Sequence, residues 1–137
     1  MAVRMSGFLK GGTVDVALVH ELSQATLRTT APRDNGGDGS SFSPTDLCAV
    51  SLGSCAITTI SMYANKHGIS LESIDFTVEK EMTSSPPRRI QKLTLVYNIK
   101  TMCSEEDFSK LKHAGNVCPV RKSLHPDVEV LETYNRI

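Results

Sequence analysis

The chain has 137 residues, of which 39% are hydrophobic and 22% are charged, and tryptophan is absent. These values are typical of a globular protein with an aliphatic core, and we expect a single domain over residues 1–137. The 15 Lys and Arg residues balance the 15 Asp and Glu residues. No basic stripe with interleaved aromatic residues is present, so nucleic acid is not an expected partner.

Targeting signals and cysteine usage indicate the compartment. The opening residues, MAVRMSGFLKGG, lack the long apolar run of a signal peptide. Four cysteines are present, but no CxxC pair occurs among them, so we expect neither a disulfide framework nor a structural zinc site. The expected location is the reducing cytoplasm, where the thiols are free. The cysteines are Cys48, Cys55, Cys103 and Cys118.

The N-terminal third predicts a hairpin followed by a loop. Residues 13–21 alternate apolar and polar side chains, which is typical of a strand, and residues 24–30 are expected to pair with it. Residues 31–44 are dense in Gly, Ser, Pro and Asp, which predicts a long loop. Such a loop is either functional or a disordered connector, and the sequence leaves both open.

A long helix is predicted from Pro44 to about His67. Ser43 suits the N-cap, Pro44 the first helical position, and Asp46 the positive end of the helix, while Gly68 ends it. Its residues are apolar or small nearly all round, and residues 47–65 carry no charge. The many Ser and Thr residues among them favour a buried helix of a soluble protein over a membrane span. One small domain can hardly enclose such a helix, which indicates a partner subunit.

The remaining elements complete an α+β fold. Residues 73–82 and 90–100 both alternate apolar and polar side chains and predict a long hairpin. Ser104 is expected to cap a helix, Pro119 to begin a short second helix, and residues 127–134 to form the closing strand. Strands, a buried helix, a hairpin, two helices and a strand in this order predict an α+β fold.

Cys118 is a candidate reactive thiol. Because it precedes Pro119, it is expected at a helix N-cap, where unpaired N–H groups and the helix dipole favour a thiolate. Arg121 and Lys122 would add positive charge if they point inward. The alternative is an ordinary half-buried thiol before a turn, and the local pattern does not decide between them.

Cys55 lies about three turns into the predicted helix, by ~3.6 residues per turn. Its small neighbours Gly53, Ser54 and Ala56 would allow another element or a substrate to approach closely. Free cysteines are commonly buried hydrophobes, so these residues alone favour a core role for Cys55. Cys48 lies about 10 Å away along the same helix, too far for a disulfide.

Other sites have weaker support. His67, His113 and His125 match no metal-ligand spacing with Cys118, and no metal is expected. A cysteine hydrolase that uses His113 or His125 as its base has no local signature. The stretch GGDGSS lacks the strand–loop–helix context of a phosphate-binding loop.

Two motifs together resemble a known family. The stretch SPTDLCAVSLGSCAITTISMYANKHGI, followed some fifty residues later by NVCPVRKSL, is similar to the OsmC/Ohr family of osmotically induced and organic hydroperoxide resistance proteins. The resemblance covers most of the chain and is closer to the broad OsmC-like branch. It implies an intertwined homodimer with long central helices packed between antiparallel sheets and two active sites at the subunit interface.

The resemblance also implies a thiol peroxidase without metal, haem or other cofactor. Cys55 matches the cysteine that attacks the peroxide and Cys118 the resolving cysteine, with an organic hydroperoxide as substrate and a dithiol as reductant. Arg33, in the loop before the helix, is the best match for the arginine that polarises the peroxide, with Arg28 as the alternative.

One position departs from the family. The glutamate that orients the arginine falls ten residues before the first cysteine, where this chain has Thr45. Asp46 is adjacent and is expected either to substitute for it or only to cap the helix, with capping favoured. This departure keeps a second hypothesis open, a dimeric ligand-binding or redox-sensing module of the same fold that is not an enzyme.

Overall fold

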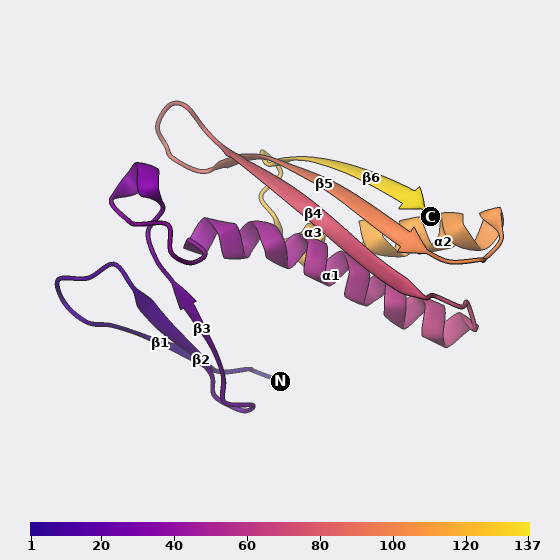
Figure 1. The fold of residues 1–137 in the computed structure, drawn as a ribbon, viewed down its shortest axis with the longest axis horizontal. Helices are drawn as coiled ribbons and strands as arrows, with labels where there is room; N and C mark the ends of the chain where they lie inside the picture. The colour runs from indigo at the N-terminus through magenta and orange to yellow at the C-terminus, as the bar shows by residue number, and fades with distance from the viewer. The chain divides into compact units, whose positions relative to one another are not determined.

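The computed structural model describes all residues, 1–137, and they form two compact units, Met1–Leu47 and Cys48–Ile137. Helix α1 begins in the first unit and runs through the second (Figure 1). The elements in chain order are β1 (Met5–Leu9), β2 (Val16–His20), β3 (Ala25–Thr29), the 3₁₀ helix η1 (Arg33–Asn35), α1 (Pro44–His67), β4 (Ser73–Met82), β5 (Ile90–Lys100), α2 (Glu105–Asn116), α3 (Pro119–Ser123) and β6 (Glu129–Arg136).

The first unit is an antiparallel sheet with the strand order β1–β2–β3. The hairpin predicted from residues 13–21 and 24–30 is confirmed as β2 and β3, joined by a turn in which Gln24 has a φ of 62°. Strand β1 was not predicted, because its sequence MSGFL contains no clear alternation. Gly7 suits its place there, since an added Cβ would come within 3.1 Å of Leu18 Cδ2 on the neighbouring strand. Residues 31–43 form the predicted loop, which contains the short helix η1.

The ends of α1 follow the local sequence. Ser43 Oγ accepts a hydrogen bond from the Asp46 N–H at 3.1 Å, and the Asp46 carboxylate accepts one from the Ser43 N–H at 2.8 Å. This reciprocal pair satisfies two donors that a helix start leaves without intrahelical partners. Gly68 ends the helix with a φ of 67°, a left-handed conformation that costs glycine little. The predicted helix Pro44–His67 is confirmed at both ends.

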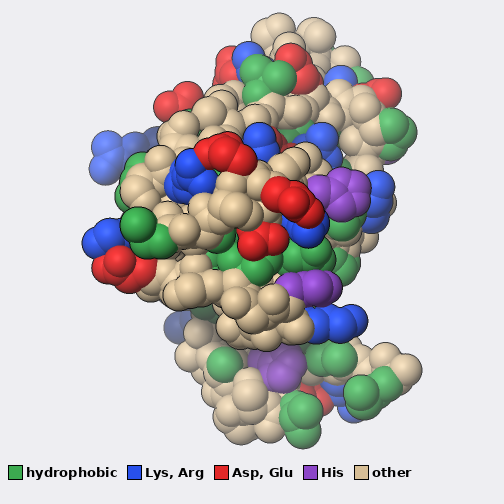
Figure 2. Space-filling view, turned by 90° about the vertical axis from the view of Figure 1, so that its right-hand side faces the viewer, with side chains coloured by type: hydrophobic (Ala, Val, Ile, Leu, Met, Phe, Trp, Pro, Cys, Tyr) green, Lys and Arg blue, Asp and Glu red, His purple; other side chains and the backbone are tan.

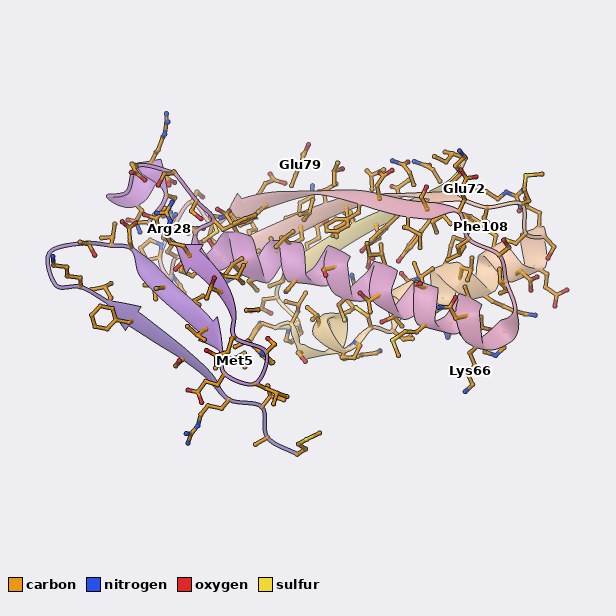
Figure 3. The ribbon with its side chains drawn as sticks, turned by 60° about the horizontal axis from the view of Figure 1, so that its bottom comes forward. Met5, Arg28, Lys66, Glu72, Glu79 and Phe108 are labelled. Carbon is orange, nitrogen blue, oxygen red and sulfur yellow. The ribbon has the colours of Figure 1, made fainter.

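The second unit packs α1 along one face of the sheet β4–β5–β6 (Figure 1). The predicted hairpin is β4 and β5, while β6 runs parallel to β5. A parallel neighbour needs a crossover connection, and helices α2 and α3 supply it. In Figure 3, Glu79 of β4 points away from α1, whereas alternate residues of β5 are buried between the sheet and the helices.

Only one side of α1 is buried within the second unit. Its buried residues recur every three or four positions, as on one face of a helix; they are Ala49, Leu52, Gly53, Ala56, Ile60 and Ala64. The other side stays accessible, with Met62 66% exposed, and Figure 3 shows Lys66 pointing away from the sheet. By length and composition α1 would also qualify as a membrane span, a test that core helices of soluble proteins pass as well.

The surface carries mixed charge. Figure 2 shows one face, on which Lys and Arg side chains are interspersed with Asp and Glu rather than gathered by sign. Several ion pairs join neighbouring strands or turns of a helix, such as Lys110 with Glu106 at 3.0 Å. Exposed pairs of this kind contribute little to stability.

Candidate active site

Cys55 lies on α1, and Gly53 sets the approach of this helix to the sheet. A Cβ on Gly53 would lie only 2.1 Å from Cε2 of Phe76, a residue of β4, so only glycine lets the helix pack this closely. The Cys55 side chain is half-buried and packs against the core cluster that contains Leu52 and Tyr97. Gly53 therefore makes room for a strand, which is one of the two uses that the sequence suggested for the small residues around Cys55.

Cys118 is the N-cap of α3, as predicted. Pro119 is the first helical residue, and the Cys118 sulfur accepts a hydrogen bond from the Arg121 N–H at 3.4 Å. The thiol has no exposed surface and belongs to the same core cluster. Its full burial differs from the half-buried thiol that the local sequence suggested as the alternative, because α3 lies against the sheet and α1.

The structure brings Cys55 and Cys118 together. The Cys55 side chain packs against the core cluster that contains Cys118, close enough to raise the pKa of the Cys118 thiol, although the two residues lie far apart in the sequence. Neither cysteine is in a disulfide. If one of the two sulfurs is oxidised, the other therefore already lies next to it. Cys48 is exposed and Cys103 is half-buried in a second core cluster, so neither belongs to this pair.

The pKa of the Cys118 thiol is raised above its ordinary value. Burial is the largest cause; the neighbouring Cys55 thiol and the negative charge of Glu132 act in the same direction, while the Arg121 N–H lowers the pKa. This is a correction to the prediction from the helix end, which favoured a stabilised thiolate. The N–H contact exists, but burial outweighs it.

The positive charge that Arg121 was expected to add near Cys118 is offset by a carboxylate. The Arg121 guanidinium donates to the Glu132 carboxylate at 2.6 Å, and Lys122 is exposed. Arg121 thus directs its backbone N–H to the sulfur and its charge to a carboxylate. The sequence analysis identified Arg121 and Lys122 as nearby cations but did not identify Glu132.

Glu132 is a buried acid next to the thiol pair. Its side chain is only 7% exposed and, besides Arg121, accepts hydrogen bonds from the hydroxyls of Tyr97 and Tyr134, each at 3.0 Å. The two tyrosine rings stack with centroids 4.6 Å apart. Burial is the largest cause that raises the pKa of each phenol, and the negative charge of Glu132 adds to it. A signal for Glu132 exists in the sequence, since it alternates with Val130 and Tyr134 on the inward face of β6.

The two candidate arginines lie in the first unit and make contacts within it. Arg33 Nε donates to the Asp38 carbonyl at 3.0 Å. Arg28 donates to the Asp15 carboxylate at 3.3 Å and to Ser40. Neither contact involves the cysteine pair, so the predicted approach of Arg33 to Cys55 stays a prediction.

Thr45 and Asp46 stand at the start of α1. The Thr45 hydroxyl lies 3.2 Å from Ser43 Oγ. Asp46 accepts from the Ser43 N–H, which is the capping role that the sequence favoured. Its predicted second role, as substitute for the family glutamate, stays a prediction.

An apolar groove of about 1050 Å³ lies between α1 and α2. Two lining residues adjoin the cysteines: Thr59, whose hydroxyl donates to the Cys55 carbonyl at 2.8 Å, and Pro119, which follows Cys118. Neither cysteine itself is part of the lining. No three His, Cys, Asp or Glu side chains lie close enough together to hold a metal ion. The groove is lined by Thr59, Met62, Tyr63, Lys66, Glu106, Ser109, Lys110, His113, Ala114, Val117 and Pro119.

Solved structures share this fold over nearly the whole chain. An osmotic stress induced and detoxification response protein from Psychrobacter arcticus 273-4 is 30% identical, with a TM-score of 0.88 over 98% of this chain and 96% of that one. An organic hydroperoxide resistance protein OsmC from Legionella pneumophila is 22% identical, with a TM-score of 0.73 over 98% and 97%. An organic hydroperoxide resistance protein from Elizabethkingia anophelis is 16% identical, with a TM-score of 0.78 over 100% and 97%.

No curated protein matched the sequence at the required significance. The family model for OsmC-like protein matches residues 37–132. This range contains both Cys55 and Cys118, together with Arg121 and Glu132. The α+β architecture, the matched range and the shared fold agree with the resemblance seen in the sequence, and the chain belongs to the OsmC-like protein family.

Proposed function

We propose that the protein is a thiol-dependent peroxidase that reduces organic hydroperoxides, with Cys55 as the attacking thiol and Cys118 as the resolving thiol. The observation that carries this proposal is the packing of the two thiols against each other inside an apolar cluster. Two structures of the same fold are of proteins named for organic hydroperoxide resistance, which supports the same substrate class. The reaction needs no metal and no organic cofactor.

The proposed chemistry has two steps and a reductive return. The Cys55 thiolate attacks the distal peroxide oxygen; the O–O bond breaks, and the alkoxide leaves and takes up a proton to become an alcohol. The Cys118 sulfur then attacks the Cys55 sulfenic acid; an S–S bond forms, the S–O bond breaks, and the hydroxide leaves as water. A dithiol reductant restores both thiols by disulfide exchange and becomes a disulfide itself.

The surroundings of the thiols favour an apolar substrate. The core cluster around the thiols is aliphatic and aromatic, and the groove that reaches Thr59 and Pro119 is lined mainly by apolar surface. A hydroperoxide with an organic tail gains from burying that tail, by ~25 cal/mol per Å² of apolar surface, whereas hydrogen peroxide gains nothing. An arginine at Cys55, for which Arg33 is the candidate, would lower the pKa of the attacking thiol and stabilise the leaving alkoxide.

The working assembly in this proposal is a homodimer in the cytoplasm. Its support is the side of α1 that the second unit leaves exposed, including Met62, and the apolar groove beside it. A second copy of the chain would cover surface of this kind, as in interfaces that resemble a core. The four free cysteines agree with a reducing compartment.

A binding or redox-sensing module is the second candidate, and Thr45 favours it. This position holds a glutamate in the peroxidases that the sequence resembles, and threonine forms no ion pair with an arginine. Such a module would take an apolar ligand into its groove, or form the Cys55–Cys118 disulfide once without turning over.

The test is a thiol count under anaerobic conditions before and after one equivalent of an organic hydroperoxide. The peroxidase loses two thiols per equivalent, and dithiol then sustains further consumption of peroxide. Cys118→Ser should leave a sulfenic acid on Cys55 that dimedone traps, Cys55→Ser should not react rapidly, and Cys48→Ser is the matched control on the same helix. Wild-type consumption by Cys55→Ser with an inactive Cys118→Ser would reverse the roles. Unchanged consumption in both variants would refute the peroxidase, and disulfide formation without turnover would favour the sensor.

A further inference from the structure

The buried group formed by Glu132, Arg121, Tyr97 and Tyr134 has no part in the two steps above. Its carboxylate accepts three hydrogen bonds, from two phenols and a guanidinium, and no buried polar side-chain atom in the structure lacks a partner. Burying a charge is costly even when it is paired, and apolar residues of similar volume commonly replace a buried ion pair without loss of stability. A core that needed only packing would therefore not require Glu132.

The group surrounds one side of the resolving thiol. Cys118 packs in one core cluster with Cys55 on α1, Tyr97 on β5 and Tyr134 on β6, and Arg121 on its own helix α3 donates its N–H to the sulfur. Glu132 on β6 joins this group through its hydrogen bonds with Tyr97, Tyr134 and Arg121. The cation among these neighbours, the Arg121 guanidinium, is turned to Glu132 at 2.6 Å. A thiolate at Cys118 would have the Arg121 N–H as a donor, but it would also lie beside a carboxylate.

The hydroxyls of Tyr97 and Tyr134 would contribute little to stabilising a thiolate at Cys118. A phenol has one proton to donate; the acceptor of Tyr97 is Glu132 at 3.0 Å, and the acceptors of Tyr134 are Glu132 at 3.0 Å and the amide oxygen of Asn116 at 3.1 Å. These hydroxyls therefore donate to other acceptors, and the donor to the Cys118 sulfur is the Arg121 N–H.

We propose that Glu132 is a positioning residue that holds Cys118 as a neutral thiol, so that Cys55 is the thiol that attacks first. The inference rests on the proposed function for its consequence, the assignment of roles to the two cysteines. In the resting protein, the neutral thiol of Cys118 is a poor nucleophile toward peroxide. Once Cys55 is a sulfenic acid, Cys118 gives up its proton as the S–S bond forms, and that proton balances the hydroxide that leaves as water.

The experiment titrates Cys118 as the sole cysteine of the full chain, with Cys48, Cys55 and Cys103 changed to Ser, by thiolate absorbance near 240 nm. We expect a midpoint above the ordinary thiol value of about 8.5. Glu132→Gln should lower it by about one pH unit, because the change removes the negative charge and frees the Arg121 guanidinium. Glu132→Asp, which keeps the charge, should retain most of the elevation. Glu129→Gln, an exposed acid on the same strand, should have no effect.

Equal midpoints in Glu132→Gln and its parent would overturn the inference. If Glu132→Gln does not fold, the parent still decides, since a midpoint at or below the ordinary thiol value would also overturn it. Added to Cys55→Ser, which should not react rapidly with peroxide, Glu132→Gln should allow a sulfenic acid to form on Cys118 that dimedone traps. A wild-type protein that reduces no hydroperoxide would refute the proposed function, and the titration would still decide the effect of Glu132.

Discussion

Replacing Gly53 with alanine should destabilise the protein, although the same change stabilises most helices. In the middle of an exposed helix, glycine to alanine gains about 1 kcal/mol. Here the new Cβ would lie 2.1, 2.3 and 2.7 Å from three carbons of the Phe76 ring, which is held between α1 and β4 with its centroid 6.2 Å from that of Tyr97. Overpacking of this kind costs about 1–3 kcal/mol. Because all three contacts are far inside van der Waals distance, we take the upper end and expect a net loss of about 1–2 kcal/mol.

Urea unfolding followed by circular dichroism, at one fixed protein concentration, measures this loss as a lower midpoint with an unchanged slope. Ser54→Ala is the matched control, since Ser54 is the exposed neighbour in the same helix, and it should be neutral or slightly stabilising. The helix must also move away from β4 to admit the methyl group, so disulfide formation between Cys55 and Cys118 should slow. A Gly53→Ala protein as stable as the wild type would show that the Phe76 ring moves aside at no cost. Gly53 would then not be needed for the close packing of α1 on β4.

Three further predictions concern the site and the assembly. Arg33→Ala should slow peroxide consumption by about 100-fold, much more than Arg28→Ala, when rates are compared at equal protein; equal activity in Arg33→Ala and wild type would remove Arg33 from the site. The protein should scatter light as a homodimer at micromolar concentration, with an interface on the order of 2,000 Å² or more; a stable folded monomer would contradict this. Because the pKa of Cys118 is raised, stopped-flow measurement of the resolving step should show a rate that increases with pH through the neutral range, since Cys118 must lose its proton to form the S–S bond; a rate that is already constant below pH 7 would contradict the raised pKa.

The roles of the two cysteines show where reasoning from local sequence is insufficient. Cys118 before Pro119 predicts a helix N-cap, and both the cap and the N–H contact with the sulfur are found. Of the two alternatives that the local sequence left open, the stabilised thiolate disagrees with the raised pKa of Cys118, because burial outweighs one hydrogen bond. A helix start is encoded within about four residues, whereas the burial of the Cys118 thiol depends on every element that packs around it.

Local patterns in the sequence determined the elements of this protein. Ser43, Asp46 and Gly68 set the ends of α1, and alternation set β2 to β5, because caps and side-chain periodicity act between near neighbours in the chain. The same patterns, with the two cysteine motifs, also identified the family. Strand β1 escaped prediction because five residues around a glycine carry too little alternation.

Only the tertiary structure decided what surrounds the thiols. The contact between Cys55 and Cys118 depends on α1 packing against the sheet and on the crossover that returns the chain beside β5. In the sequence, Glu132 is only one acid in a predicted strand. The pairing of β6 with β5 brings its carboxylate to Tyr97, Tyr134 and Arg121. Each of these contacts joins residues from different elements, and no local pattern encodes their distance. The free energy of a buried charge depends on all of its neighbours at once, so the chemistry of this pair is a property of the packed fold.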